Sequence, residues 1–494
     1  MIKKITTLLM ILSAVITASA QYSTPGNGEV YSLDDLVLLS DDVVSFEDGA
    51  YLISEDLEIS ALDTLKIHQN GKLLLAPEIQ ITVAGVLDIN APDEFILDCS
   101  EEESKFKGIR VEQDANIFLN YTVMRNGGGI RILTGLKSVI THSEFRDNYG
   151  GVATGGVINI SRGSHIIEGN IFKENETPAI GTAGNAGASA ALYIANNHIE
   201  ANNLSNSNRP QINIGPTGTE NDTIKIINNT IIGDRGATRA GAIAVSALIG
   251  GNVRAIIQDN IIRDNRYGIT IAGTNVWAEI KANIIEDNDT EGDPMLGGSG
   301  VNLLTQNPDE YDVILTQNQF RRNLWGVTLQ YDAEANLGDD INNPGNNVFS
   351  ENGNNGEIFA LYNNTSNTIM AKHNCWIENE DITLEDAEEV IYHQNDDDSL
   401  GEVIFGPVSC AILGVEDSTL SDVKIAPNPA RNFIVLQGVE LFDQAMIYDV
   451  KGKEVGRYVI RENSEQINFD LKTGVYFIRL QNSQQQTTKK LVVR

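Results

Sequence analysis

The segments Asn260-Ile-Ile-Arg-Asp-Asn265 and Asn283-Ile-Ile-Glu-Asp-Asn288 share one pattern, in which two asparagines flank an apolar residue at the third position. Each copy of the pattern begins 22 to 35 positions after the previous one; the other copies cover 170–175, 197–202, 318–323, 347–352 and 374–379, and looser copies cover 121–126, 143–148 and 229–234. A regular repeat of this length predicts a solenoid, in which each unit stacks on the next.

Each unit is predicted to contain two short strands joined at an asparagine. A second apolar residue lies three positions before most of the first asparagines, and alternating apolar residues are typical of half-buried strands. Several units continue with Gly-apolar-x-apolar, as in Gly129-Ile-Arg-Ile132, Gly268-Ile-Thr-Ile271 and Gly326-Val-Thr-Leu329. This order of strand, turn, strand and loop fits one coil of a parallel β-helix, so the predicted fold class is all-β.

The asparagines are predicted to turn the chain between strands, because asparagine tolerates the left-handed backbone conformation better than most residues. Stacked coils would also let asparagines at one corner hydrogen-bond to one another. The predicted turn ladder consists of Asn148, Asn175, Asn202, Asn265, Asn288, Asn323 and Asn352, with Asp234 in the equivalent position of one unit. The alternative is that these asparagines bind sugars.

Charged pairs occupy the two positions before the second asparagine, as in Arg146-Asp147, Lys173-Glu174, Arg263-Asp264, Glu286-Asp287 and Arg321-Arg322. Stacking predicts a solvated charge ladder, with ion pairs between coils that contribute less than about 1 kcal/mol each. The alternative is a catalytic groove, with Arg or Lys as the base and carboxylates that hold calcium. The sequence identifies no catalytic residue.

Charge is unevenly distributed along the chain. Of its 35 basic and 68 acidic residues, residues 21–422 carry 22 and 61, a net charge of −39, whereas residues 423–494 carry 11 and 7, a net charge of +4. An acidic body is expected to repel nucleic acid and anionic lipid, which bind clustered Lys and Arg. The simpler interpretation of the same charge is solubility.

Three cysteines are too few for a disulfide framework in 494 residues. Cys375 and Cys410 lie near the end of the repeats and are candidates for one bridge, whereas Cys99 is predicted to be a buried thiol. The six histidines have no metal-ligand spacing, so we expect no metal site and no cofactor. The aspartates at 396–398 are a candidate for calcium, but without a spaced ligand loop an acidic surface turn is the simpler prediction.

The two ends of the chain differ from the repeats. Residues 1–20 combine two lysines, an apolar run and Ala18-Ser19-Ala20, which is typical of a secretory signal peptide and not of a membrane span. Residues 21–42 are predicted to be a lead-in to a β-helix of residues 43–410, whose early coils lack the asparagine turn. Residues 383–392 have helical character and are predicted to cover the last coil.

Residues 43–410 resemble the right-handed parallel β-helix repeat family, which includes the pectate-lyase-like folds. The resemblance rests on the asparagine repeat and on the closing coil, which runs from Asn374-Cys-Trp376 through a short helix to the segment 396–407. It implies the fold, but it gives little evidence for an activity, because function depends on a site and not on a fold.

Residues 411–422 are interpreted as a linker, and residues 423–494 as a small β-sandwich. The latter resemble the C-terminal sorting domain of the type IX secretion system through a Pro-Asn-Pro entry, a Tyr-Asp-x-x-Gly hairpin, a Gly-Val-Tyr strand and a basic-apolar tail. The sorting-signal residues are Pro427, Asn428, Pro429, Gly452, Gly474, Tyr476, Lys490 and Leu491.

The resemblance to the sorting domain implies a Bacteroidota-type cell and translocation by the type IX machinery from the periplasm across the outer membrane. It also implies removal of the domain, followed by release or lipopolysaccharide anchoring of the body. We therefore expect a secreted or surface-displayed protein without a transmembrane segment.

Three functions remain open: a glycan-binding, adhesin-like or structural rod; a polysaccharide lyase or glycoside hydrolase; and a part of a larger exported assembly. Hydrolysis needs two carboxylates about 5–9.5 Å apart, which many neighbouring coils could supply. The resemblance implies that a lyase would act on polyuronates. A body of net charge −39 would repel these polyanions unless calcium bridged them to the protein. An enzyme predicts one lateral groove with clustered basic residues and carboxylates, flanked by long loops.

Overall fold

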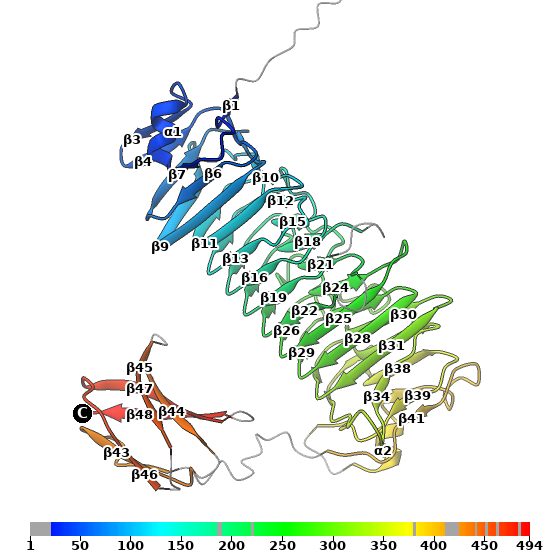
Figure 1. The fold of residues 1–494 in the computed structure, drawn as a ribbon. Helices are drawn as coiled ribbons and strands as arrows, with labels where there is room; N and C mark the ends of the chain where they lie inside the picture. The colour runs from blue at the N-terminus through cyan, green and yellow to red at the C-terminus, as the bar shows by residue number, and fades with distance from the viewer. Residues whose placement is uncertain are drawn as a thin grey trace, which may run out of the picture. The chain divides into compact units, whose positions relative to one another are not determined.

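The structure is a computed structural model that describes residues 21–184, 190–218, 222–378, 382–410, 424–439, 442–449, 453–460, 464–482 and 486–494. The chain divides into two compact units, Met1–Ala411 and Ile412–Arg494 (Figure 1). The predicted signal peptide and the predicted linker lie outside the described residues.

The first unit is a solenoid of stacked coils, and its parallel strands form three columns (Figure 1). One column, which we call the long sheet, contains 14 strands. They are β1 Gln21–Ser23, β5 Asp56–Ile59, β8 Gln80–Val83, β10 Gly108–Val111, β12 Ile130–Ile132, β15 Ile158–Ile160, β18 Ile180–Thr182, β21 Ile212–Ile214, β24 Ile243–Ser246, β27 Ile269–Ala272, β30 Ser299–Thr305, β33 Trp325–Tyr331, β38 Leu361–Thr365 and β40 Ile391–Tyr392.

The other two columns share the long strands β9 (Val86–Cys99) and β11 (Asn116–Arg125), each of which pairs in both. The column before the first asparagine contains β2 Val30–Tyr31, β6 Thr64–Ile67, β13 Val139–Thr141, β16 Ile166–Glu168, β19 Tyr193–Ala195, β22 Ile224–Ile227, β25 Val253–Gln258, β28 Asn275–Lys281, β31 Glu310–Thr316, β34 Asn336–Gly338, β39 Ile369–Ala371 and β41 Val403–Ile404. The column between the asparagines contains β4 Ala50–Ile53, β7 Gly71–Leu75, β14 Glu144–Arg146, β17 Ile171–Lys173, β20 His198–Glu200, β23 Thr230–Ile232, β26 Ile261–Arg263, β29 Ile284–Glu286, β32 Gln319–Arg321 and β35 Val348–Ser350. At its start, β3 Val44–Glu47 pairs antiparallel with β4, and the hairpin of β36 Gly353–Asn354 and β37 Glu357–Ile358 follows its last strand.

The core consists of like side chains stacked from coil to coil. The apolar residues that the repeat predicts to be inside are buried, and they include Phe145, Phe172, Ile199, Ile231, Ile262, Ile285, Phe320, Phe349 and Trp376. The ring centroid of Phe349 lies 4.9 Å from the ring centroid of Phe320 and 4.8 Å from that of Trp376. The prediction of the parallel β-helix and its apolar core is therefore confirmed.

Buried asparagines form two hydrogen-bonded ladders, one at each corner of the asparagine repeat. In the ladder of first asparagines, Asn283 Nδ2 donates to Asn318 Oδ1 at 3.0 Å, and Asn283 Oδ1 accepts from Asn260 Nδ2 at 2.9 Å. The ladder of second asparagines contains Asn148, Asn175, Asn202, Asn265, Asn288, Asn323 and Asn352. All of these side chains are buried within the body, which leaves them no access to a sugar.

The prediction that the asparagines themselves take the left-handed conformation is wrong. The residue before each ladder asparagine takes it instead, for example Ala282 with φ 52°, Asp287 with φ 55° and Gln317 with φ 58°. The turn is thus complete before the asparagine, whose amide then points into the coil and bonds to the coils on either side.

One looser copy of the repeat, which covers 229–234, also differs from the prediction. Asp234 lies outside the ladder and accepts a hydrogen bond from the backbone of Gly236. Gln211 replaces it: its Oε1 accepts from Asn202 Nδ2 at 3.1 Å and its Nε2 donates to Asn265 Oδ1 at 2.9 Å. The longer glutamine side chain comes from the residue just before strand β21, a position that the repeat pattern does not reveal.

Pairing in the solenoid begins earlier than residue 43, because β1 pairs with β5 and β2 with β6. The lead-in of residues 21–42 also contains a helix that we did not predict, α1 (Leu33–Leu39), whose Leu33 and Leu36 are buried in the core. Ser32 caps this helix in a capping box with Asp35.

The other end of the solenoid is closed by a short helix and a disulfide bond. Helix α2 (Leu384–Glu388) is shorter than the predicted segment 383–392, which ends in strand β40. Its Ala387 joins the core. Cys375 and Cys410 form the disulfide bond, and Cys99 is a buried free thiol.

The second unit is the predicted β-sandwich of two antiparallel sheets. One sheet contains β42 Lys424–Ala426, β43 Phe433–Gln437 and β46 Ser464–Asn468, and the other contains β45 Glu454–Val459, β44 Gln444–Asp449, β47 Gly474–Gln481 and β48 Gln486–Val493 in spatial order. The core between them includes Ile434, Leu436, Ile447, Ile478 and Leu480.

Candidate functional site

The outward side chains of the long sheet form a column of one residue per coil. Paired strands align Arg110, Arg131, Asn159, Gly181, Asn213, Ala244, Thr270, Asn302, Thr328, Tyr362 and Tyr392. The side chains on this face therefore change from arginine, through amides and small residues, to aromatic rings. Gly181 leaves this face of the sheet without a side chain at its position, and a Cβ there would lie 2.2 Å from the carbonyl oxygen of Gly155.

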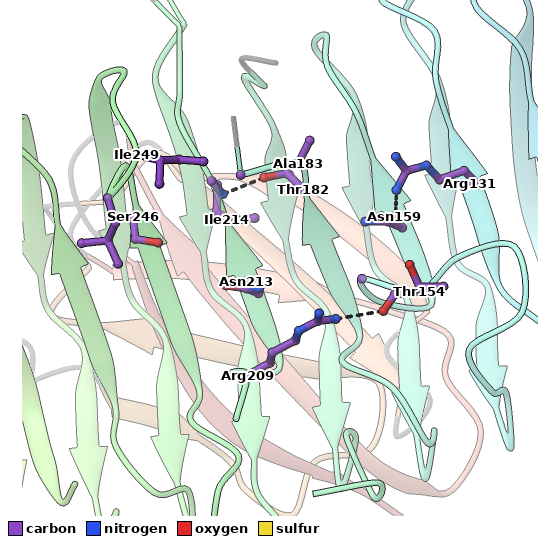
Figure 2. Close-up of a pocket in the computed structure, with 14 residues that line it drawn as sticks. Arg131, Thr154, Asn159, Thr182, Ala183, Arg209, Asn213, Ile214, Ser246 and Ile249 are labelled. Carbon is purple, nitrogen blue, oxygen red and sulfur yellow. Dashed lines mark hydrogen bonds between the residues drawn. The ribbon is translucent and has the colours of Figure 1, made fainter. Parts of the chain in front are cut away.

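A first hollow of about 340 Å³ lies at the arginine end of this column (Figure 2). Arg131 and Arg209 line it, together with Asn159, Asn213 and the tip of the loop at Leu248. Arg131 donates through Nη1 to Asn159 Oδ1 and through Nη2 to Ser161 Oγ, and Arg209 Nη1 donates to the carbonyl oxygen of Thr154 at 2.9 Å.

Two further hollows continue along the same sheet. One of about 420 Å³ shares Leu248 with the first hollow, and it shares Leu304 and Gln330 with the next one, of about 540 Å³. We call the three together the long-sheet groove. From Arg131 to Tyr362 it crosses nine strands, which corresponds to roughly 40 Å at the usual strand spacing.

Aromatic rings cluster at the far end of the groove. The ring of Trp325 lies 4.7 Å from Phe359 and 5.0 Å from Tyr362, and Tyr362 stacks on Tyr392 at 4.7 Å. Burial raises the pKa of Tyr267, which lines the same hollow, to about 12. Tyr267 therefore stays protonated at neutral pH and is a hydrogen-bond donor, not a base.

The arginines of the groove have no carboxylate partner among the described residues. Arg266, at the aromatic end, donates to the carbonyl oxygen of Leu296 and to Asn208, so all three arginines of the groove bond to neutral oxygens. None of the described residues that line the three hollows is Asp or Glu. Burial and the neighbouring Arg110 lower the pKa of Arg131.

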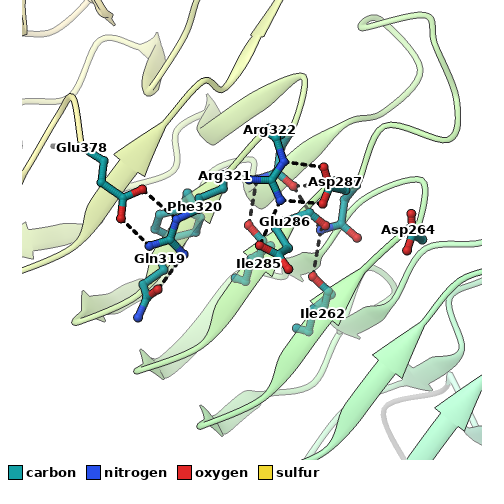
Figure 3. A network of polar contacts seen from close by, with 12 residues as sticks. Ile262, Asp264, Ile285, Glu286, Asp287, Gln319, Phe320, Arg321, Arg322 and Glu378 are labelled. Carbon is teal, nitrogen blue, oxygen red and sulfur yellow. Dashed lines mark hydrogen bonds and ion pairs between the residues drawn. The ribbon is translucent and has the colours of Figure 1, made fainter. Parts of the chain in front are cut away.

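The charged pairs between the ladder asparagines lie elsewhere, and several of them pair with one another across neighbouring coils (Figure 3). Arg322 donates to both carboxylate oxygens of Asp287 at 2.7 Å, and Arg321 makes a bidentate pair with Glu378 at 2.6 and 2.8 Å. Hydrogen bonding to Asp287 raises the pKa of Arg322. These paired residues form a charge ladder, and none of the charged pairs between the ladder asparagines lines one of the three hollows as the structure describes them.

The aspartates at 396–398 form a hydrogen-bonded turn. Asp396 accepts from the backbone of His393, and Asp397 accepts from the backbone and hydroxyl of Ser399 at 2.9 and 2.7 Å. No three His, Cys, Asp or Glu side chains in the described ranges are grouped so that they could hold a metal ion.

The structure brings the two ends of the predicted sorting signal together. Asn428, between Pro427 and Pro429, donates through Nδ2 to the carbonyl oxygen of Lys490 at 2.8 Å and accepts from the backbone of Val492 at 2.9 Å. Leu491 is buried.

The central residues of the sorting signal lie on the adjacent strand. Gly474 begins β47, and the hydroxyl of Tyr476 donates to the carbonyl oxygen of Lys472 at 2.9 Å. Gly452 lies outside the described residues. The Pro-Asn-Pro segment therefore holds the last strand in place.

Sequence reasoning missed the long-sheet groove. Its outward residues follow loops of unequal length, so no fixed spacing links them. The third position of the Gly-apolar-x-apolar pattern could have indicated the outward residues of the groove, because this position contains Arg131, Thr270 and Thr328.

Comparison with known proteins gives two family matches. The family described as Right handed beta helix region matches residues 151–320, and the Secretion system C-terminal sorting domain matches residues 424–494. No curated protein matches the chain. Among solved structures, a point mutant of the periplasmic alginate epimerase AlgG is 14% identical with a TM-score of 0.37, over 77% of this chain and 83% of that chain.

The two family matches fall in the two units of the structure, one in each. No helix in the described part of the chain is long and apolar enough to cross a bilayer. The sorting domain directs export to the cell surface or the extracellular space. The chain is a right-handed parallel β-helix protein with a type IX secretion system C-terminal sorting domain.

Proposed function

We propose that the β-helix body is an extracellular glycan-binding protein, adhesin-like or structural, that holds an acidic polysaccharide along the long-sheet groove. The observation that carries this proposal is that Arg131, Arg209 and Arg266 of the groove have no carboxylate partner among the residues that the structure describes, in a body with 61 acidic residues. Arg131 is partly buried, and keeping its guanidinium there without a counter-ion is costly. A carboxylate or sulfate group of a ligand would supply charge-assisted hydrogen bonds to it and to the more exposed Arg209 and Arg266.

The net charge of −39 does not oppose this binding. Charges on the protein surface are screened over about 8 Å at physiological salt, so a ligand in the groove experiences mainly the side chains that line it. Calcium bridges are therefore not required. The amide of Asn213 can donate to and accept from sugar hydroxyls, Asn302 can donate to them through Nδ2, and the ring of Trp325 offers an apolar surface to a sugar ring.

The enzymatic alternative fits the groove less well. A hydrolase needs two carboxylates beside the scissile bond, and the described lining contains none. A lyase needs a proton acceptor, whereas arginine and Tyr267 are protonated at neutral pH. Lyase activity stays an alternative prediction, and turnover of any polysaccharide with or without calcium would replace the binding function.

Replacing Arg131 with glutamine is expected to weaken binding of an acidic polysaccharide by roughly tenfold to a hundredfold, since hydrogen bonds to charged groups contribute about 1.5–3 kcal/mol. Titration calorimetry with carboxylated, sulfated and neutral polysaccharides measures the effect. The matched control is Arg235→Gln, because Arg235 is paired with Asp264 and Asp289 away from the groove. Equal affinities for Arg131→Gln and the unchanged protein would contradict the proposal.

Replacing Trp325 with alanine is expected to weaken binding of acidic and neutral glycans alike, by about tenfold, because stacking on a sugar does not depend on its charge. The control is Trp277→Ala, since Trp277 lies under Arg254 on a different column of strands. Loss of glycan binding in both variants, or in Trp277→Ala alone, would exclude the long-sheet groove as the binding site.

A further inference from the structure

The four-stranded sheet of the sorting domain has an unusual outer face. An antiparallel sheet that packs its inner face against a core normally presents polar side chains on the other face. Here the outer face exposes four apolar residues, namely Val455, Val459, Val475 and Phe477, with exposed fractions of 36%, 59%, 36% and 41%.

The strand register places these residues beside aromatic and basic ones. Phe477 lies opposite Tyr448 on one side and Lys490 on the other, and Arg479 lies opposite Met446. The guanidinium of Arg479 lies 5.0 Å from the ring centre of Tyr448, and together these two side chains cover Met446. We define the outer patch as Tyr448, Val455, Val475, Phe477, Arg479 and Lys490.

The motif residues of the sorting signal divide between the two faces of this sheet. Tyr476 and Leu491 pack in the core, which accounts for their chemical type. Their neighbours Val475 and Lys490 point to the outer patch, where the fold of the domain does not require a valine. A surface that is apolar without a structural reason is a marker of an interaction site.

The charges of the outer patch restrict the partner. Within the described residues, Arg479 and Lys490 form no ion pair, whereas the nearby Arg457 is neutralised by Glu454 at 2.8 Å. The domain as a whole has a net charge of +4. A partner with an apolar surface and acidic side chains at its rim would therefore complement the patch in both hydrophobicity and charge.

We propose that the outer patch is the surface by which a component of the type IX secretion machinery recognises this domain, and that the component offers an apolar surface rimmed by acidic residues. Docking buries Phe477 and Val475, and Arg479 and Lys490 pair with the acidic rim.

The test is export of the full chain in cells that contain the type IX machinery. Phe477→Ser is expected to increase the fraction of protein retained in the periplasm at least tenfold over the unchanged chain. The matched control is Phe433→Ser, because Phe433 is 37% exposed but lies on the three-stranded sheet. Normal export of Phe477→Ser, or equal retention of both variants, would overturn the proposal.

A second variant separates recognition from folding. Lys490→Glu changes only an exposed charge, so its thermal unfolding should match that of the unchanged chain while its export falls. Export of Lys490→Glu at the normal level would also overturn the proposal. Experiments on the purified chain would reveal two other occupants of the patch. Dimers that the Phe477→Ser substitution abolishes would identify a second copy of the chain as the occupant. Protection of β47 from hydrogen exchange that is lost when the β-helix body is removed would identify the acidic body as the occupant. Either result would replace the machinery as the partner.

Discussion

Replacing Asn283 with alanine is expected to lower the free energy of unfolding of the β-helix body by about 3–5 kcal/mol. The side chain of Asn283 donates to the carbonyl oxygen of Ile257 at 2.8 Å and to Asn318 Oδ1 at 3.0 Å. It also accepts from the backbone N and Nδ2 of Asn260 at 3.0 and 2.9 Å. Alanine leaves several of these buried groups without a partner, and each such group costs about 1–3 kcal/mol.

Denaturant-induced unfolding of the full chain measures this loss. Asn283→Asp has nearly the same shape but loses both donors, so we expect it to be about as destabilising as alanine. The control is Asn342→Ala, because Asn342 is exposed and substitutions of that kind usually change stability by less than about 0.5 kcal/mol. A loss in Asn283→Ala no larger than that of the control would show that the ladder is not needed for stability.

Reduction of the Cys375–Cys410 bridge is expected to destabilise the last coil by about 4 kcal/mol, the chain-entropy value for a loop of 35 residues. The bridge ties residue 410 to the coil that contains the buried Trp376. Strands β40 and β41 of segment 382–410 also pair with β38 and β39, so hydrogen exchange should accelerate mainly at the C-terminal end of the segment, next to Cys410.

Cys410→Ala tests the same bridge without a reductant. This variant should exchange as fast as the reduced protein and should not respond to reductant. Cys99→Ala is the control, because Cys99 is buried but forms no disulfide bond. Exchange in segment 382–410 of this variant should match that of the unchanged protein. Unchanged exchange in segment 382–410 after reduction would mean that packing alone closes the solenoid.

The sequence predicted the interior of the solenoid well because every coil meets the same physical demand. Phe172, Ile285 and Phe349 each stack on an equivalent residue above and below, so the apolar position must recur. The corner was predicted less well, because both a turn and a hydrogen-bonded ladder favour asparagine. Residues such as Ala282 and Gln317 show that the turn accepts other side chains, whereas the buried ladder needs the amide.

The candidate groove was not predictable in the same way. Arg131, Asn213 and Trp325 come from strands that follow loops of different lengths, and outward positions are under no common packing demand. Within the described part of the chain, the lack of carboxylate partners for Arg131, Arg209 and Arg266 is a property of the folded state alone, because acidic residues are abundant on both sides of these arginines in the sequence.

The location of a bound glycan tests the central claim most directly. Hydroxyl-radical footprinting of the full chain, with and without a saturating acidic polysaccharide, measures the protection of individual aromatic residues. The account predicts protection of Trp325 and Tyr362 in the long-sheet groove, with no change at Trp277 or at the exposed Tyr121. Protection of Trp277 or Tyr121, with the groove residues unchanged, would contradict it.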